Sequence, residues 1–438
     1  MPSPDIVAVA RGRLRGLFAA LAAALLAGCM SLPDVSHRPW DQALPAEPAS
    51  PLVRLAAASV PPGELSGFSL VSTGAEALRL RLLLIERATR SIDLQVYQFK
   101  TDASGRALIR ALRDAAARGV RVRLLIDDLY TAGDDALWLG LAATPGIEVR
   151  LFNPFMAGRD SHVGRLLDSA LGEDRLHRRM HNKLLVADAA LAVAGGRNIG
   201  DLYFLTATPG WFVDIDVLVA GALLPSMSAA FDLYWNSDYS HALHSVIDDP
   251  LGRPQRRAAL AQVLDLRCDS AACAAVERLQ GSTSAMVQAF DLGWLPMHLA
   301  PAHVAHDSPD KIENEQVASD LAMLAASGSQ VRLLVAQAFL QARSEVLIVS
   351  PYFIPGPVGV EGLRTLRQRG VQLTLLTNSL AATDEPAVHL GYRKYRAALL
   401  REGVVLYEWS PARGGRVLRE LVVGGTVLRL HAKAALVD

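Results

Sequence analysis

The chain has 438 residues, of which 51% are hydrophobic and 20% charged, and its formal net charge is zero. This length and apolar content suit two domains, or one large duplicated domain, and exclude a disordered chain. The zero net charge excludes the strong overall basic field of a protein held on nucleic acid by electrostatics, although a local basic patch stays possible.

A targeting segment opens the chain. Three arginines precede the apolar run LFAALAAALLAG, which is too short to span a bilayer and is typical of a signal peptide. The tetrapeptide LAGC, which ends at Cys29, resembles the lipobox of bacterial lipoproteins. Residues 1–28 are therefore predicted to be a lipoprotein signal peptide, and Cys29 is predicted to carry the lipid. An ordinary signal peptide that happens to contain a cysteine is the alternative.

A proline-rich stretch follows, and residues 29–64 are predicted to form an extended tether. No later run is long and charge-free enough for a transmembrane helix. We therefore expect a membrane-anchored lipoprotein of the bacterial cell envelope that faces the periplasm. Met30, which is not an aspartate, slightly favours the outer membrane.

Alternating helices and strands come next. The stretch STGAEALRLRLLLIERATRSIDLQVYQF predicts a helix and then a strand, and ASGRALIRALRDAAARGVRVRLLIDD predicts a helix that ends at Gly119 and then a buried strand. IEVRLF (147–152) is a further strand. This order predicts an α/β sandwich.

The same order returns about 250 residues later. Arg90-Ser91 corresponds to Arg343-Ser344, and Arg118-Gly119-Val120 corresponds to Arg369-Gly370-Val371. The chain is therefore predicted to be an internal duplication. Its halves are placed at 65–240 and 326–438, with a connecting region at 241–325. Two such halves usually bury a common interface and place a site between them.

A short motif repeats with the same spacing. His181, Lys183 and Asp188 form H-x-K-x4-D, and His431, Lys433 and Asp438 form it again, although the whole chain has only five lysines. Composition alone gives about 0.008 expected matches. Two matches in register with a duplication are therefore the strongest functional signal in the sequence.

Both motifs have strand character, which predicts where their side chains point. Alternation sends each histidine and lysine to one face and each aspartate to the other. We therefore expect the aspartates to organise a turn. Two lysines can neutralise the charge of a phosphodiester, while one histidine attacks phosphorus and the other protonates the leaving oxygen. This chemistry needs no metal or cofactor, and none is expected.

The paired motifs resemble the HKD signature of the phospholipase D superfamily. Gly195-Gly196-Arg197-Asn198 is similar to the G-[GS]-x-N that follows that motif. Longer stretches resemble the bacterial class C cardiolipin synthases: RRMHNK, GGRNIGDLYF, FVDIDVLVAG, FDLYWNS, NSLAATDEPAVHLGY and GVVLYE. The resemblance covers roughly residues 65–438. It implies duplicated α-β-α sandwich halves related by a pseudo-twofold axis, with the active site at their interface.

The resemblance also implies roles for single residues. His181 is the expected nucleophile and His431 the general acid and base, with the reverse assignment left open. Gly196 and Asn198 are expected to bind the substrate phosphate. Asp214 is expected to orient the first histidine. Asp216 is the fallback, and the alternative is that both carboxylates only cap a strand edge.

The resemblance implies an enzyme that transfers phosphatidyl groups between phospholipids. The expected reaction makes cardiolipin from phosphatidylglycerol, with or without phosphatidylethanolamine. The alternatives are hydrolysis to phosphatidic acid, a nucleic-acid phosphodiesterase and a non-catalytic lipoprotein, and no nucleic-acid partner is expected. The family continues beyond its second motif, whereas this sequence stops at Asp438. We therefore expect a fragment of a longer reading frame or an incomplete second half-site.

Weaker features have two readings each. Tyr97 and Tyr352, at equivalent strand ends, could line a substrate path, but core packing is favoured. Arg178, Arg179 and Arg197 could attract an anionic headgroup, but solvated surface is the default.

Two further features lie outside the motifs. Residues 163–171 form an amphipathic stretch that fits a membrane-dipping element, although an ordinary packed helix is favoured. Cys268 and Cys273 lie five apart in a helix-like run, which puts them on different faces. Two inert thiols are therefore favoured over a disulfide.

Overall fold

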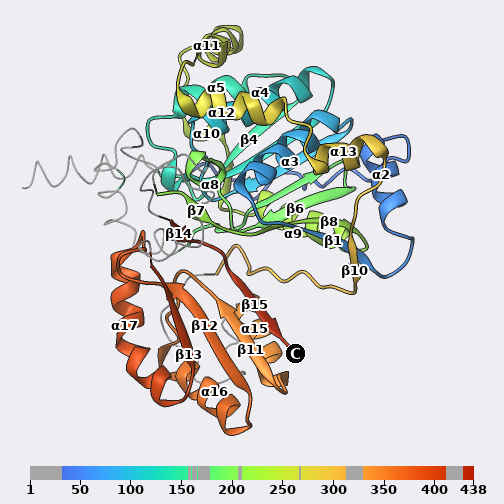
Figure 1. The fold of residues 1–438 in the computed structure, drawn as a ribbon. Coiled ribbons are helices and arrows are strands. Elements are labelled where there is room, and N and C mark those ends of the chain that lie inside the picture. The colour runs from blue at the N-terminus through green and yellow to red at the C-terminus, as the bar shows by residue number, and fades with distance from the viewer. Residues whose placement is uncertain are drawn as a thin grey trace, which may run out of the picture.

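The computed structural model describes residues 32–155, 159, 165, 178–205, 210–265, 268–311, 329–410 and 428–438. These residues form two α/β lobes (Figure 1). The first lobe is built on a nine-stranded mixed sheet and the second on a four-stranded sheet, and a two-stranded ribbon belongs to neither sheet. The signal peptide and Cys29 lie outside the described residues.

The large sheet runs in the order β10-β1-β8-β6-β5-β2-β3-β4-β9. At its centre, β2, β3 and β4 are parallel, while β5, β6 and β8 are antiparallel to their neighbours. Every residue of β2 is buried, as expected of a strand covered on both faces. The strands are β1 (Ser66–Val71), β2 (Ser91–Val96), β3 (Arg121–Asp127), β4 (Ile147–Phe152), β5 (Leu184–Ala187), β6 (Leu191–Gly195), β8 (Asp216–Gly221), β9 (Ser240–Ala242) and β10 (His298–Ala300).

Helices cover both faces of this sheet. α3 (Gly74–Arg87) and α4 (Ala103–Ala117) pack on one face, and α9 (Leu224–Trp235) packs on the other (Figure 1). α3 begins in a capping box, where Thr73 Oγ1 accepts a hydrogen bond from Glu76 N at 3.3 Å and donates to its carboxylate. α4 is followed by Gly119 at φ 92°, which confirms the predicted glycine stop. The other helical segments of this lobe are η1 (Asp128–Tyr130), α5 (Asp135–Ala142), α8 (Asp201–Phe204), α10 (Leu243–Val246), α11 (Arg253–Asp265), α12 (Ala271–Gln280) and α13 (Ala285–Leu292).

The second lobe repeats the centre of the first. Its sheet has the order β13-β12-β11-β15, with β11, β12 and β13 parallel and β15 antiparallel to β11. This matches β4-β3-β2-β5 strand for strand and confirms the predicted duplication. The elements are α15 (Gln330–Gln341), β11 (Glu345–Val349), α16 (Gly356–Gln368), β12 (Gln372–Asn378), α17 (Pro386–Arg401), β13 (Val405–Trp409) and β15 (Ala434–Val437).

The ribbon joins the lobes. β7 (Phe212–Val213) of the first lobe pairs in parallel with β14 (Arg429–Leu430), which comes directly before the second motif. The Asn378 side chain, at the end of β12, fixes β14 from the other side, because its amide both accepts from Leu430 N and donates to Leu430 O. The second motif is therefore attached to both lobes at their boundary.

The predicted tether differs from the structure over much of residues 32–64. The Arg38 guanidinium donates to the carbonyl of Ser240 at 2.5 Å, and the Asp41 carboxylate accepts from the Trp235 indole at 2.9 Å. Leu52, in α2 (Pro51–Ser59), lies in the core with 1% of its surface exposed. Proline at the first turn of a helix starts that helix, so proline content alone could not separate this packed segment from a linker.

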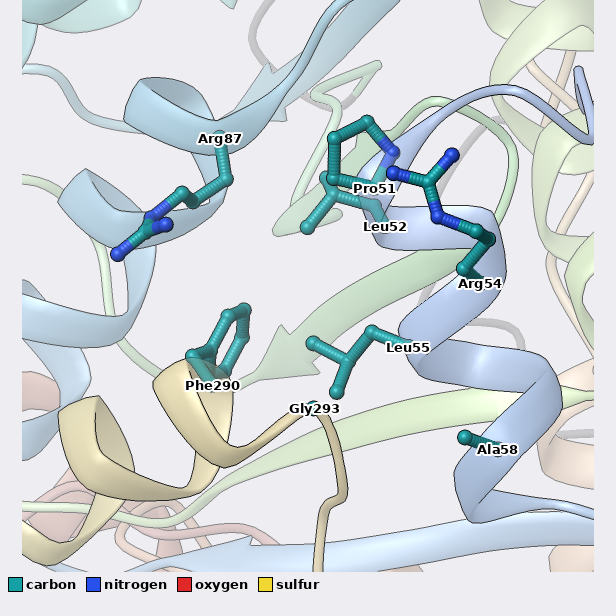
Figure 2. A pocket seen from close by; sticks show the side chains of 8 residues that line it. All are labelled: Pro51, Leu52, Arg54, Leu55, Ala58, Arg87, Phe290 and Gly293. Atoms are coloured by element: carbon teal, nitrogen blue, oxygen red, sulfur yellow. The ribbon is translucent and has the colours of Figure 1, made fainter.

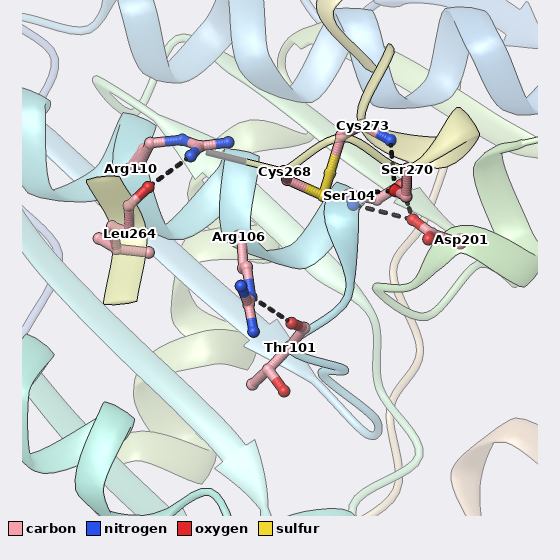
Figure 3. The surroundings of a disulfide bond; sticks show 9 residues. All are labelled: Thr101, Ser104, Arg106, Arg110, Asp201, Leu264, Cys268, Ser270 and Cys273. Atoms are coloured by element: carbon pink, nitrogen blue, oxygen red, sulfur yellow. Dashed lines mark hydrogen bonds between the residues drawn. A yellow bond between two sulfur atoms is a disulfide. The ribbon is translucent and has the colours of Figure 1, made fainter. Parts of the chain in front are cut away.

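The predicted connecting region 241–325 also differs, because its described part packs on the first lobe. β10 pairs with β1 at the sheet edge, and α11 and α12 lie against α5 and α4. The favoured pair of inert thiols is wrong, because Cys268 and Cys273 form a disulfide with Cα atoms 5.9 Å apart (Figure 3). α12 begins only at Ala271, with Ser270 as its cap, so Cys268 precedes the helix and the chain can turn back. The amphipathic stretch 163–171 lies, apart from Arg165, outside the described residues.

Candidate active site

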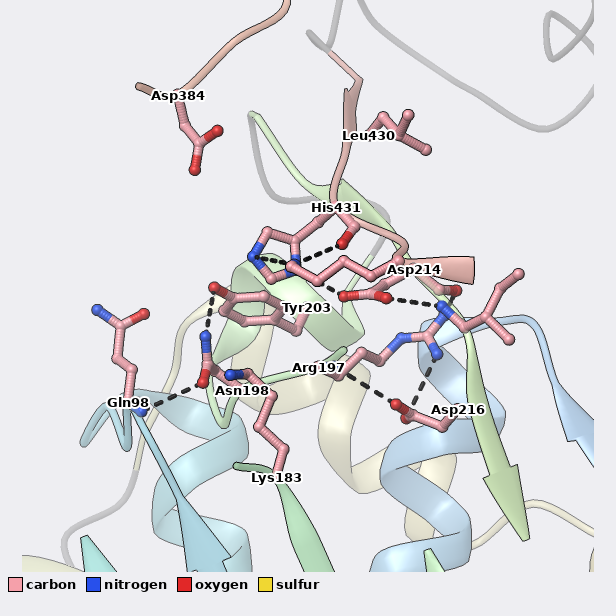
Figure 4. Close-up of polar contacts among 12 residues, drawn as sticks. Gln98, Lys183, Arg197, Asn198, Tyr203, Asp214, Asp216, Asp384, Leu430 and His431 are labelled. Carbon is pink, nitrogen blue, oxygen red and sulfur yellow. Dashed lines mark hydrogen bonds and ion pairs between the residues drawn. The ribbon is translucent and has the colours of Figure 1, made fainter. Parts of the chain in front are cut away.

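Each motif places its lysine beside its histidine. Lys183 Nζ lies 3.3 Å from His181 Nδ1 and donates to the His181 carbonyl at 2.7 Å. Lys433 Nζ lies 3.5 Å from His431 Nε2 and donates to the His431 carbonyl at 2.9 Å. The strands begin after the lysines, at Leu184 and Ala434, so both pairs lie where the chain enters the sheet. Figure 4 shows the Lys183 side chain extending toward Asn198, Tyr203 and His431, and the charges of His431 and Lys433 also act on the pKa of His181. The two pairs therefore face one site.

The motif aspartates hold the neighbouring strand. Asp188 is buried, and its carboxylate accepts from the backbone N–H groups of Thr89, Arg90 and Ser91, at the start of β2. Asp438 makes the equivalent bonds at the start of β11. Among the described residues, neither carboxylate has a hydrogen bond to a motif histidine or lysine. Each aspartate therefore ties down the turn into the neighbouring strand, whereas the sequence pointed to the turn after its own strand.

Asp214 lies against the second histidine. Its Oδ2 atom is 2.7 Å from His431 Nδ1, and its side chain is fully buried. The expectation that Asp214 orients the first histidine is therefore wrong, because the β7–β14 ribbon carries His431 across to it (Figure 4). Asp216 has another role, since it pairs with Arg81 at 2.8 Å and Arg197 at 3.3 Å in the first lobe.

The glycine pair in GGRN allows these two carboxylates to approach the backbone. A Cβ atom on Gly195 would lie 2.0 Å from Asp216 Oδ1, and one on Gly196 would lie 2.2 Å from Asp214 Oδ1. Asn198 is buried, and its amide accepts from Gln98 N at 3.2 Å and donates to Tyr203 Oη at 2.9 Å. Among the described residues, these bonds leave one amide N–H of Asn198 without a partner. Phosphate binding by Gly196 and Asn198 stays a prediction.

The arginines around the first motif are structural rather than solvated. Arg197 is 1% exposed and donates to the carbonyls of Val71 and Ser72 besides pairing with Asp216. Arg179 pairs with the fully buried Asp127 at 3.3 Å. The default of solvated surface is therefore wrong for Arg197 and Arg179.

Tyrosines line both half-sites. The Tyr97 ring lies 4.3 Å from the His181 ring and 5.3 Å from Lys183 Nζ. In the second lobe, the Tyr352 ring lies 6.1 Å from the His431 ring and 5.4 Å from Lys433 Nζ. The favoured reading of these tyrosines as core packing is therefore wrong.

Sequence reasoning missed Tyr203 and Asp384. The Tyr203 ring lies 5.4 Å from that of His431, and the Asp384 carboxylate accepts from Tyr352 Oη at 2.6 Å. Both residues fall inside stretches that resemble the family, GGRNIGDLYF and NSLAATDEPAVHLGY. The signal was therefore present, but no spacing rule singled them out.

The electrostatics distinguish the two histidines. Burial of the imidazole and the positive charges of Lys183 and Lys433 lower the pKa of His181 well below its ordinary value, although the residue as a whole is exposed. Burial also lowers the pKa of His431, but the hydrogen bond and charge of Asp214 oppose that shift. Burial raises the pKa of Asp214, but the hydrogen bond and charge of His431, with the charge of Lys433 and the backbone N–H of Ile215, together lower that pKa overall. Of the two histidines, and within the described residues, only His431 therefore has a carboxylate that stabilises its protonated form.

Burial also lowers the pKa values of the two motif lysines. Burial, followed by the charge of Lys433, lowers the pKa of Lys183 to about 7. Burial lowers the pKa of Lys433 too, while Asp214 and Asp384 oppose that change. An anionic ligand bound beside both lysines would raise both pKa values and so stabilise the two positive charges.

Other candidate sites are weaker. A cavity of about 300 Å³ lies between α2, α3 and α13 (Figure 2). Its lining is mainly apolar, apart from Arg54 and Arg87, and includes no motif residue. Within the described residues, His, Cys, Asp and Glu side chains form no group of three that could hold a metal ion. No helix in the described part of the chain is long and apolar enough to cross a membrane.

Comparisons with known proteins agree with this geometry. The family model described as cardiolipin synthase, PLD-like domain, matches residues 82–207 and 335–438. Cardiolipin synthase C of Escherichia coli is 35% identical over 395 residues, which cover 88% of this chain and 79% of that protein. An uncharacterized protein of Helicobacter pylori is 30% identical over 347 residues, which cover 77% of this chain and 64% of that protein. The crystal structure of phosphatidylserine synthase of Haemophilus influenzae has a TM-score of 0.52 and 15% identity, over 85% of this chain and 76% of that chain, which supports the fold alone.

Proposed function

Since the chain belongs to the cardiolipin synthase family of phospholipase D-like proteins, we propose that it makes cardiolipin from phosphatidylglycerol, with or without phosphatidylethanolamine as a second substrate. The chain is a phosphatidyltransferase of the phospholipase D type. The observation that carries the proposal is the pair of His-Lys units that face one site from two lobes, with a carboxylate on one histidine only. Similarity to cardiolipin synthase C supports the choice of lipid.

The difference between the histidines supports the following roles for them. His181 is the nucleophile, because burial and two lysines keep its imidazole neutral and its lone pair available. His431 is the general acid and base, because Asp214 stabilises its imidazolium and fixes the ring by the bond to Nδ1. Nε2 of His431 is then the atom that exchanges the proton with the substrate.

The reaction proceeds in two displacements at phosphorus. The His181 imidazole forms a bond to phosphorus as the bond to the headgroup oxygen breaks, and His431 gives its proton to that oxygen. A hydroxyl of a second phosphatidylglycerol then forms a bond to phosphorus as the bond between His181 and phosphorus breaks, and the proton of that hydroxyl passes to His431. Lys183 and Lys433 stabilise the charge on the non-bridging oxygens in both steps.

Hydrolysis to phosphatidic acid is the nearest alternative, because water can replace the lipid alcohol in the second step without any change of residues. A nucleic-acid phosphodiesterase would use the same residues, but zero net charge and the similarity to a cardiolipin synthase favour a lipid substrate. We also propose attachment to the bacterial cell envelope through Cys29, as the lipobox-like LAGC predicts.

The test is a product assay on membranes that contain the full chain. Labelled phosphatidylglycerol is expected to give cardiolipin and glycerol, and His181→Ala is expected to give neither. Phosphatidic acid as the sole product would support the hydrolase instead. Cleavage of nucleic acid without any lipid product would make the lipid proposal wrong.

A further inference from the structure

The two half-sites differ behind their tyrosines. In the first lobe, Tyr97 meets the edge of Tyr130, with ring centroids 5.3 Å apart. Tyr130 lies in η1, which directly follows β3. In the second lobe, Tyr352 instead donates to Asp384, in the segment that follows β12. Since β12 repeats β3, a neutral phenol stands on one side of the site and a carboxylate on the other.

The Asp384 carboxylate is only half satisfied. Its Oδ2 atom accepts from Tyr352 Oη, while its Oδ1 atom is buried and has no hydrogen-bond partner among the residues that the structure describes. Most buried polar atoms in proteins have a hydrogen-bond partner, so this oxygen calls for an explanation. This oxygen is therefore a candidate for a ligand that carries a donor.

Asp384 faces the site rather than the surface. Figure 4 shows its carboxylate turned toward Tyr203 and His431. Its charge acts on Lys433, where it opposes the lowering of the lysine pKa by burial. Burial and the bond to Asp384 both raise the pKa of Tyr352, so this phenol keeps its proton and stays a donor. The carboxylate is thereby held in place through Oδ2, while its buried Oδ1 has no donor among the described residues.

We propose that Asp384 is the residue that positions the headgroup alcohol, with its free Oδ1 accepting a hydrogen bond from a hydroxyl that does not react. This inference rests on the proposed function, in which the alcohol leaves and enters beside His431. When one hydroxyl of glycerol reacts at phosphorus, the others stay free to donate to Asp384. Water has no second hydroxyl group for this contact. A carboxylate also repels anionic headgroups.

The consequence is a preference for polyols over water and over simple alcohols. In the second displacement, the reacting hydroxyl gives its proton to His431 and forms the bond to phosphorus, while His181 leaves. A second hydroxyl bound to Asp384 holds the first in line for this attack. The same contact favours transfer over hydrolysis.

The first test uses the wild-type chain and therefore does not depend on the folding of a variant. Membranes that contain it are given labelled phosphatidylglycerol with glycerol or 1-propanol, which has the same carbon chain but a single hydroxyl. At equal alcohol concentrations, the ratio of phosphatidyl-propanol formation to glycerol exchange is expected to be about 0.1 or less. A factor of this size corresponds to the loss of one hydrogen bond to a charged group. Equal use of the two alcohols would overturn the proposal.

The second test uses Asp384→Asn, with Glu385→Gln as the matched control at the exposed neighbouring position. Asp384→Asn is expected to reduce the ratio of glycerol use to 1-propanol use about tenfold, raise the KM for glycerol and increase the proportion of phosphatidic acid. An effect through Lys433 would change the use of both alcohols equally and leave that ratio unchanged. The control should behave like wild type. An equal loss of activity with glycerol and with 1-propanol in Asp384→Asn would show that Asp384 has only a structural role. Absence of any lipid product from wild type would instead refute the proposed function.

Discussion

Replacing Asp188 by Asn tests whether the third residue of the motif supports the fold or takes part in the chemistry. Its two oxygens accept from Arg90 N at 2.8 Å, Ser91 N at 3.0 Å, Thr89 N at 3.0 Å and Ser50 Oγ at 2.5 Å. Six residues, of which Leu184–Ala187 form β5, separate Asp188 from His181, a distance on the order of 20 Å. Asp188 therefore lies too far from the histidine to touch its substrate.

The expected loss of stability in Asp188→Asn follows from these hydrogen bonds. An asparagine keeps one acceptor oxygen and turns an NH₂ group toward groups that themselves donate. The variant loses the bond to Thr89 N and the charge that strengthens the others, which lowers the free energy of unfolding by roughly 2–4 kcal/mol. For a lobe of this size, the melting temperature falls by on the order of 10 °C.

Asp438→Asn is the matched control, because it removes the equivalent bonds at an exposed position. Its melting temperature should fall less than that of Asp188→Asn. Differential scanning fluorimetry of both variants, with kcat measured well below the melting temperature, gives the comparison. Turnover of folded Asp188→Asn should stay within severalfold of wild type. An unchanged melting temperature with a hundredfold loss of kcat would refute the scaffold role.

Three further predictions follow from the site and its surroundings. Asp214→Asn removes the group that raises the pKa of His431, so kcat should fall by roughly 10²–10⁴, with the larger loss at high pH where the histidine is unprotonated. Lys183, with its pKa lowered to about 7, is charged below that pH and neutral above it, so kcat/KM should decline as pH rises through 7. In Lys183→Arg any activity that is left should show this decline at higher pH, because arginine keeps its charge. Cys268→Ser should lower the free energy of unfolding by about 2 kcal/mol in urea denaturation and leave turnover unchanged, since the disulfide closes a short loop before α12.

The repeated motif and the repeated helix-strand order made the fold and the His-Lys pairs predictable. Spacing in sequence fixes which residues recur, and recurrence at one period implies two superposable lobes. The geometry agrees with the pattern: β15 pairs with β11 as β5 pairs with β2. The alternation of side chains along a strand also correctly predicted that Asp188 and His181 have different surroundings, although the strand itself begins only after Lys183.

Contacts between the lobes could not be predicted from local pattern. The partner of Asp214 depends on the β7–β14 ribbon, whose two strands are separated by more than 200 residues and hold only two residues each. Tyr352 looked like a core residue because an aromatic at a strand end has the same pattern whether it faces a core or a cleft. The disulfide was missed because a helix boundary of a few residues decides whether Cys268 and Cys273 can meet.

The central claim is that His181 carries the phosphatidyl group between the two displacements. The most direct measurement is rapid quenching of the full chain with labelled phosphatidylglycerol, followed by peptide mass spectrometry under alkaline conditions that preserve phosphohistidine. The label is expected on the peptide that contains His181, at a level that declines when an alcohol acceptor is added. A label on His431, or turnover without any labelled histidine, would contradict the mechanism.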